Sequence, residues 1–139
     1  MNNLKSRRAF IVGLSSTKVT NKERHFLRKY KPWGVILFAR NIKSVDQTKK
    51  LTNDIKKIFK DSKYPILIDE EGGMVTRIRS IIDNSHFPAK YFGDNYKKDK
   101  TKSLLYLRTY IEQISHLLRY MGISINTVPV LDIPRAFTS

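Results

Sequence analysis

The residues best suited to chemistry lie in one short segment, Asp69-Glu70-Glu71-Gly72-Gly73-Met74-Val75-Thr76-Arg77. Its two glycines let the backbone turn sharply and approach a ligand closely. Arg77 can then return toward Asp69 as a planar group with several hydrogen-bond donors. A carboxylate and a guanidinium that face one pocket can hold the vicinal hydroxyls of a sugar by charge-assisted hydrogen bonds. Asp69 and Arg77 are therefore the candidate binding residues, although this spacing is not specific to sugars.

Polar residues follow other strand-like runs as well. Arg40 and Asn41 follow the second apolar run, and Asp132 stands at the end of the last one. In a parallel barrel the carboxyl ends of the strands share one rim, where active sites are built. That arrangement would place Asp69, Asp132 and Arg40 around a common mouth. The alternative is ordinary turn chemistry, since Asp and Asn are common in turns.

Four apolar runs, at residues 9–14, 33–38, 64–68 and 123–132, alternate with helix-like segments. Helices are predicted after two capping boxes, at Thr20 to Glu23 and Ser44 to Gln47. A longer helix is predicted over about residues 103–121, and residues 72–103 read as irregular and turn-rich. Five residues of the long helix are expected to face the core: Leu107, Ile111, Ile114, Leu118 and Met121.

Strands without polar alternation are buried on both faces, as in parallel sheets that helices cover. The pattern predicts an α/β fold with about four parallel strands and three helices. A doubly wound sheet and a TIM barrel both begin this way. The strands are not followed by G-x-G-x-x-G or G-x-x-x-x-G-K-[ST], which would favour a nucleotide fold.

The composition excludes several classes of protein. The 139 residues include 27 basic and 12 acidic side chains, giving a net charge of +15, and no cysteine. A disulfide framework, a thiolate metal site and a cysteine nucleophile are therefore excluded. The apolar runs are far shorter than the roughly 18–20 residues of a membrane span. The excess charge favours a solvated helix face over nucleic-acid binding, and that face is predicted to carry Lys49, Lys50, Lys56, Lys57, Lys60 and Lys63.

The start of the chain is similar to a twin-arginine export signal, Ser6-Arg7-Arg8-Ala9-Phe10-Ile11. The apolar stretch that follows reaches only Leu14, shorter than the roughly 7–15 residues of a signal core, and no A-x-A site follows. We therefore expect a basic leader over residues 1–8, a domain over residues 9–139, and a cytoplasmic protein.

Four ordered motifs resemble the N-terminal domain of glycoside hydrolase family 3. They are Trp33-Gly34-Val35-Ile36-Leu37-Phe38-Ala39-Arg40-Asn41, the Asp69 to Arg77 segment, Phe87-Pro88-Ala89, and Ile125-Asn126-Thr127-Val128-Pro129-Val130-Leu131-Asp132. The resemblance covers nearly the whole chain from about residue 9, and within the family it is greatest to the bacterial beta-N-acetylhexosaminidases of cell-wall recycling. It implies a TIM-type barrel, no cofactor, and hydrolysis of terminal N-acetylglucosamine from muropeptides.

The resemblance also implies roles for particular residues. Asp69 and Arg77 match the family residues that bind the non-reducing sugar. The family pattern D-Q-E-G-G-R-V-Q-R is altered here at Glu70, Met74 and Thr76. Asp132 matches the aspartate of the P-V-L-D segment and is expected to support the rim, with no chemistry of its own.

The catalytic residues of the family are missing from this sequence. Retaining hydrolysis needs a nucleophilic carboxylate and a proton donor. The family supplies an Asp late in the barrel and a His near a K-H-F-P-G-H-G motif, which this sequence lacks. The three histidines, His25, His86 and His116, are interpreted as surface histidines or as histidines with satisfied hydrogen bonds, so neither a catalytic residue nor a metal ligand is assigned.

A full TIM barrel needs about 250 residues, so we expect only the first half of one. The chain is then the sugar-binding half of a glycoside hydrolase, inactive alone and completed by a second polypeptide. Two alternatives remain open: a non-catalytic glycan-binding or interaction protein, and a basic nucleic-acid binder.

Overall fold

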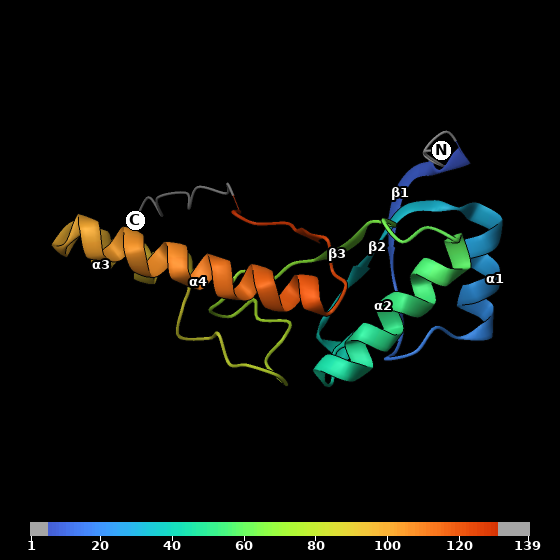
Figure 1. The fold of residues 1–139 in the computed structure, drawn as a ribbon, viewed down its shortest axis with the longest axis horizontal. Helices are drawn as coiled ribbons and strands as arrows, with labels where there is room; N and C mark the ends of the chain where they lie inside the picture. Colours follow the sequence, from blue (N-terminus) through green and yellow to red (C-terminus); the bar gives the residue numbers. More distant parts are fainter. Residues whose placement is uncertain (1–5, 131–139) are drawn as a thin grey trace, which may run out of the picture.

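One parallel sheet organises the chain, and each of its strands pairs with the strand that precedes it in the sequence (Figure 1). The computed structural model describes residues 6–130. The strands are β1 (Arg8–Gly13), β2 (Pro32–Leu37), β3 (Ile66–Ile68) and β4 (Ile125–Asn126). All three pairings are parallel, so the predicted α/β fold with four parallel strands is confirmed. Within residues 6–130 the sheet is open, with β1 and β4 at its edges.

In the part of the chain that the structure describes, four α-helices accompany the sheet, one more than predicted. They are α1 (Asn21–Tyr30), α2 (Val45–Phe59), α3 (Ala89–Lys98) and α4 (Lys100–Tyr120), and a short 3-10 helix, η2 (Ala39–Asn41), follows β2. The expectation that residues 72–103 are irregular throughout was wrong because it missed α3. The only buried residue of this helix is Phe92, and its N-cap residue, Pro88, forms no side-chain cap, so its sequence signal is weak.

The long helix also differs from its prediction. Asp99 caps it by accepting from the Lys102 N–H, so α4 begins at Lys100 rather than near residue 103. Ile114, Leu118 and Met121 are buried as expected, but Ile111 is 51% exposed. Ile111 lines the groove beside β4. Figure 1 shows that the amino-terminal part of α4 extends past the sheet together with α3.

The two predicted capping boxes have different outcomes. The first is confirmed, since the Glu23 N–H donates to Thr20 Oγ1 and the Thr20 N–H donates to the Glu23 carboxylate. At the second, the Gln47 N–H donates to Ser44 Oγ at 3.3 Å. The Gln47 side chain accepts instead from the Lys43 N–H at 2.8 Å, so the reciprocal bond forms one residue earlier than predicted.

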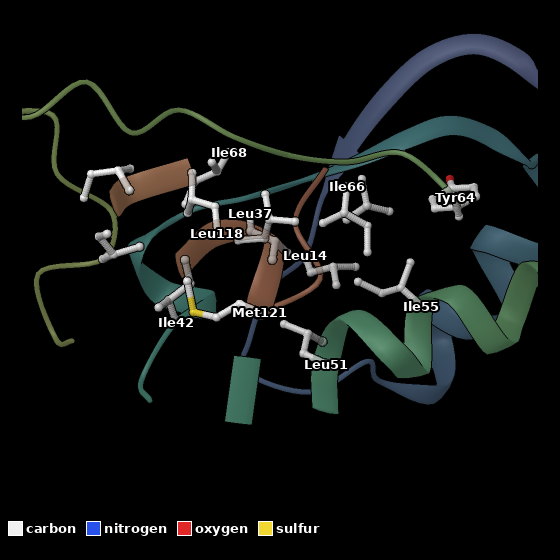
Figure 2. Packing of buried hydrophobic residues seen from close by; sticks show 14 of the residues in the cluster. Leu14, Leu37, Ile42, Leu51, Ile55, Tyr64, Ile66, Ile68, Leu118 and Met121 are labelled. Carbon is white, nitrogen blue, oxygen red and sulfur yellow. The ribbon is translucent and has the colours of Figure 1, made fainter. Parts of the chain in front are cut away.

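The core lies between the sheet and helices α1, α2 and α4 (Figure 2). β3 is buried at every position, which explains its continuous apolar run. Tyr64 is fully buried just before β3, where its ring stacks on Phe59 and its hydroxyl donates to the Pro32 carbonyl at 2.8 Å. None of the helices in the described part of the chain is long and apolar enough to cross a membrane.

The fourth strand is shorter than predicted. The strand expected over residues 123–132 comprises only Ile125–Asn126 within the described residues, and residues 131 and 132 of that expectation lie outside them. The leader predicted over residues 1–8 also lies mostly outside the described residues, except that Arg8 already belongs to β1.

Candidate functional site

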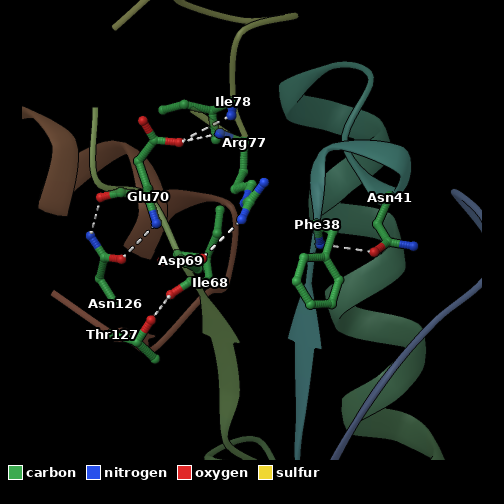
Figure 3. A network of polar contacts seen from close by, with 9 residues as sticks. All are labelled: Phe38, Asn41, Ile68, Asp69, Glu70, Arg77, Ile78, Asn126 and Thr127. Atoms are coloured by element: carbon green, nitrogen blue, oxygen red, sulfur yellow. Dashed lines mark hydrogen bonds and ion pairs between the residues drawn. The ribbon is translucent and has the colours of Figure 1, made fainter. Parts of the chain in front are cut away.

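The Asp69 and Arg77 side chains meet at the carboxyl end of β3 (Figure 3). Asp69 directly follows the last residue of that strand. The Arg77 guanidinium donates to Asp69 Oδ2 at 2.9 Å, and about a quarter of each side chain is exposed. Asp69 Oδ1 accepts no hydrogen bond from the described residues, and Arg77 Nε is buried without a partner among them. The pair is therefore placed to contact a ligand, and its role in binding stays a prediction.

Glu70 holds the loop that follows β3 in place through hydrogen bonds to the backbone at Arg77 and Ile78. This role was not predicted from the sequence. The Glu70 side chain is only 3% exposed. Glu70 Oε2 accepts from the backbone N–H groups of Arg77 (2.6 Å) and Ile78 (3.2 Å), and Oε1 accepts from Asn84 Nδ2 at 3.3 Å. A buried carboxylate persists when such donors satisfy it. The signal that was available was the replacement of the family's Gln by Glu at this position.

Asn126 in β4 fixes the Glu70 backbone. Its side-chain oxygen accepts from the Glu70 N–H at 3.0 Å, and its Nδ2 donates to the Glu70 carbonyl at 3.1 Å. Beside it, the Thr127 N–H donates to the Ile68 carbonyl at 2.9 Å. Figure 3 shows the two Asn126 bonds next to the Asp69–Arg77 pair, together with a bond from the Thr127 hydroxyl to the same Ile68 carbonyl. The end of β3 is thus held by β4 on one side and by its own loop on the other.

The two glycines of the loop allow a close approach to the Phe87-Pro88 segment. Gly72 and Gly73 have φ angles of +76° and +65°, which side-chain-bearing residues rarely adopt. A Cβ at Gly72 would lie 2.4 Å from the Phe87 carbonyl oxygen, and one at Gly73 would lie 2.9 Å from Pro88 Cβ. The next residue, Met74, is fully exposed. Two of the sequence motifs therefore pack directly against each other.

Residues at the end of β2 form the other side of the site. The Phe38 ring lies close to two guanidinium groups, with the Arg40 Cζ 4.6 Å and the Arg77 Cζ 5.6 Å from its centroid. Arg40 Nε donates to the Leu14 carbonyl at 2.8 Å, and Asn41 donates to the same carbonyl at 3.0 Å. Both side chains thus tie the ends of β1 and β2 together. These bonds favour the turn interpretation for Arg40 and Asn41, while Asp132 lies outside the described residues.

Tyr110 of α4 lies behind the loop. Burial raises the pKa of Tyr110, and the negative charge of Glu70 raises it further. Its hydroxyl oxygen would be 3.2 Å from a Cβ at Gly72, so it lies close to the loop backbone. Both effects favour the neutral phenol over the phenolate at this position.

The described residues contain no group of three His, Cys, Asp or Glu side chains that could hold a metal ion. His25, His86 and His116 are all exposed, as predicted, and they belong to α1, the segment before α3, and α4. The candidate site therefore consists of a carboxylate, a guanidinium and an aromatic ring.

The family model and the curated relatives that match this chain point to the same protein family. Residues 3–138 match the family described as glycosyl hydrolase family 3 N terminal domain. A curated relative, the beta-hexosaminidase of Xanthomonas axonopodis pv. citri (strain 306), is 30% identical over 127 residues, covering 90% of this chain. The match covers 37% of that relative, so this chain spans little more than a third of its length.

Solved structures show the same fold. Native NagZ from Neisseria gonorrhoeae superposes with a TM-score of 0.79 at 27% identity, covering 91% of this chain and 37% of that one. NagZ from the same organism in complex with N-trifluoroacetyl-D-glucosamine gives a TM-score of 0.72 at 28% identity, covering 91% of this chain and 38% of that one.

Proposed function

Because the chain belongs to the glycosyl hydrolase family 3 N-terminal domains, we propose that it forms the sugar-binding part of a beta-N-acetylhexosaminidase-type glycoside hydrolase. The observation that carries this proposal is the Asp69–Arg77 pair at the end of β3. A beta-hexosaminidase relative and a NagZ structure that holds a glucosamine derivative support the choice of an N-acetylglucosamine-type sugar.

The chemistry of the pair suits a sugar. Asp69 Oδ1 is available to accept from a hydroxyl, while Arg77 donates to its neighbour. Because the two groups are held together by an ion pair, they are oriented before the ligand arrives, which reduces the entropy lost on binding. The Phe38 ring beside Arg77 offers an apolar surface to the C–H groups of a sugar ring.

We also propose that this chain does not cleave the glycosidic bond by itself. Retaining hydrolysis needs two catalytic groups on opposite sides of the scissile bond. The histidines are exposed, and the ends of β1 to β3 supply Asp69 as an ion-paired carboxylate. The muropeptide substrate, the cytoplasmic location and the retaining mechanism that the family resemblance implies belong to this proposal.

The remaining walls of the site would come from a second polypeptide segment carrying further βα units. β4 leaves its outer edge unpaired within the described residues. Beside it lies a groove of about 350 Å³. Its lining comprises Ile111, Glu112, Ser115, Leu118, Arg119, Ile123, Ser124, Ile125 and Asn126. An open edge flanked by a groove with both apolar and polar side chains can accept a further strand and its helix.

Binding of N-acetylglucosamine tests the sugar site. We expect saturable binding by saturation-transfer NMR, weakened about tenfold or more by Asp69→Asn, since a charge-assisted bond becomes neutral. Asp83→Asn is the matched control, because Asp83 is half-exposed and pairs with Arg79 elsewhere. Equal binding by the parent and Asp69→Asn would refute the assignment.

Turnover tests the second part of the proposal. The purified chain is expected to release no nitrophenol from a nitrophenyl N-acetylglucosaminide above the buffer rate. Robust turnover that survives purification to homogeneity would show that the described site is catalytically complete. Activity that appears only after mixing with residues of the remaining barrel would support completion by a second segment.

A further inference from the structure

A second hollow lies at the opposite end of the sheet from Asp69 and Arg77. It measures about 340 Å³, close to the lower end of the range for ligand pockets. Its lining comprises Ser6, Arg7, Arg28, Lys31, Ile58 and Phe59. Because the strands are parallel and β1 and β2 begin at Arg8 and Pro32, the hollow lies where strands start, whereas the sugar site lies where they end.

The local backbone fixes the positions of the basic groups. Lys31 follows the end of α1 with a φ angle of 48°, and its carbonyl accepts from the Arg8 N–H at 2.9 Å. This bond joins the end of α1 to the start of β1. The carboxyl end of α2 contributes the apolar side of the hollow through Ile58 and Phe59.

Arg7 forms a rigid part of the lining. Its side chain is only 6% exposed, it pairs with Asp61, and its Cζ lies 4.7 Å from the centroid of the Tyr64 ring. The Asp61 carboxylate compensates one positive charge. Within the described residues, Arg28 and Lys31 have no ion-pair partner, so two net positive charges face the hollow.

Interaction with helix dipoles explains only part of this arrangement. Basic residues in the last turn of a helix are favourable because that end carries partial negative charge, and Arg28 lies in the last turn of α1. This effect does not account for Arg7, which precedes a strand, or for a hollow with an apolar wall on one side.

We propose that this hollow is a binding site for a small phosphate monoester that carries an apolar or aromatic group. A phosphate monoester has a charge of about −1.5 to −2 at neutral pH, which matches the two uncompensated cations. Arg28 and Lys31 donate to the phosphate oxygens, and Ile58 and Phe59 contact the organic part. The site is separate from the sugar site, and the proposal does not depend on glycosidase function.

Calorimetry with phenyl phosphate, inorganic phosphate and phenol as probes tests the proposal in the full chain. We expect phenyl phosphate to bind at least about tenfold more tightly than either inorganic phosphate or phenol, because only phenyl phosphate uses both sides of the hollow. Arg28→Gln and Lys31→Gln should each weaken this binding about tenfold. Asp69→Asn should leave it unchanged.

Lys50→Gln is the matched control, since Lys50 is an exposed residue of α2 outside the hollow. Equal weakening by Lys50→Gln and Arg28→Gln would mean diffuse attraction and would overturn the proposal. Absence of phenyl phosphate binding to a chain that is folded by circular dichroism would also overturn it. Binding of a single-stranded oligonucleotide would overturn the proposal as well, if Arg28→Gln, Lys31→Gln and Lys50→Gln all weakened it equally. That result would indicate an extended surface for polyanions.

Discussion

At the scale of single residues, the candidate site depends on a buried carboxylate, that of Glu70. The Asp69 and Arg77 side chains are partly exposed, whereas Glu70, which follows Asp69 in the sequence, is buried. Glu70 accepts from the backbone N–H groups of Arg77 and Ile78 and so determines where the Arg77 side chain begins. A carboxylate accepts at both oxygens, and here the second oxygen is used by Asn84.

Replacing Glu70 should therefore affect both stability and sugar binding. Glu70→Ala leaves the buried Ile78 N–H and the partly buried Arg77 N–H without this partner, and we expect a loss of about 1–3 kcal/mol in the free energy of unfolding. Urea denaturation measures this loss. Glu112→Ala removes a carboxylate that is exposed on α4 and is expected to change stability by less than about 0.5 kcal/mol.

A second substitution, at Asn84, tests whether the effect at Glu70 depends on its pairing with the Asn84 side chain. Glu70→Gln keeps one accepting oxygen but places its amide NH₂ group, a donor, opposite the donor Asn84 Nδ2. This variant should therefore also lower the free energy of unfolding. Adding Asn84→Asp restores an acceptor opposite that donor. The double variant is expected to regain much of the lost stability, and a purely additive result would contradict the proposed pairing.

At the scale of elements, the loop between β3 and α3 shows why two motifs occur together. Gly72 and Gly73 approach Phe87 and Pro88 so closely that a side chain would collide with them. The loop that carries Arg77 is thus shaped by the segment that leads into α3. Both motifs must be intact for Arg77 to reach Asp69.

Two glycine substitutions with opposite expected signs test this packing. Gly72→Ala introduces a Cβ 2.4 Å from the Phe87 carbonyl oxygen at a positive φ, and should lower the free energy of unfolding by about 1–3 kcal/mol. Gly93→Ala in α3 meets no atom within 4 Å and should raise it by about 0.5–1 kcal/mol. Thermal unfolding of both variants measures the difference, and similar effects would contradict the collision.

The sequence predicted the repeating part of this architecture better than its irregular part. The four parallel strands followed from continuous apolar runs such as Trp33 to Phe38, although only β3 is buried at every position. The sequence did not predict α3 because this helix buries only one residue. It predicted a buried Ile111 because helical periodicity does not show where the sheet ends. The contact of Asp69 with Arg77 could be anticipated from their motif, but the support from Glu70 and Asn126 depends on tertiary hydrogen bonds.

At the scale of the whole molecule, one buried tyrosine connects the sheet, α2 and the amino-terminal strand. Tyr64 stacks on Phe59, donates to the Pro32 carbonyl and lies under Arg7. Burial raises the pKa of Tyr64 well above its usual value, and the nearby Arg7 charge offsets this only in part. Global stability is therefore linked to the protonation of this phenol.

Alkaline unfolding tests this linkage. An unfolded tyrosine has a pKa of about 10, so the contribution of Tyr64 is complete below about pH 10 and declines as the pH rises above it. Tyr64→Phe should cost about 1 kcal/mol at pH 8 through the lost hydrogen bond. This cost should shrink at pH 10.5, as measured by urea denaturation.

The control for that experiment is Tyr106→Phe, because Tyr106 is 56% exposed. It should leave stability unchanged at both pH values. A cost of Tyr64→Phe that stays constant between pH 8 and pH 10.5 would show that the Tyr64 phenol does not couple to unfolding.

The strand order β1-β2-β3-β4 has a consequence for how the molecule is made. Each strand pairs with one that has already left the ribosome, so the sheet can grow vectorially during translation without waiting for distant chain. The newest strand always presents the growing edge. Any later βα unit, covalently continuous or supplied separately, would join at β4 without displacing an existing neighbour.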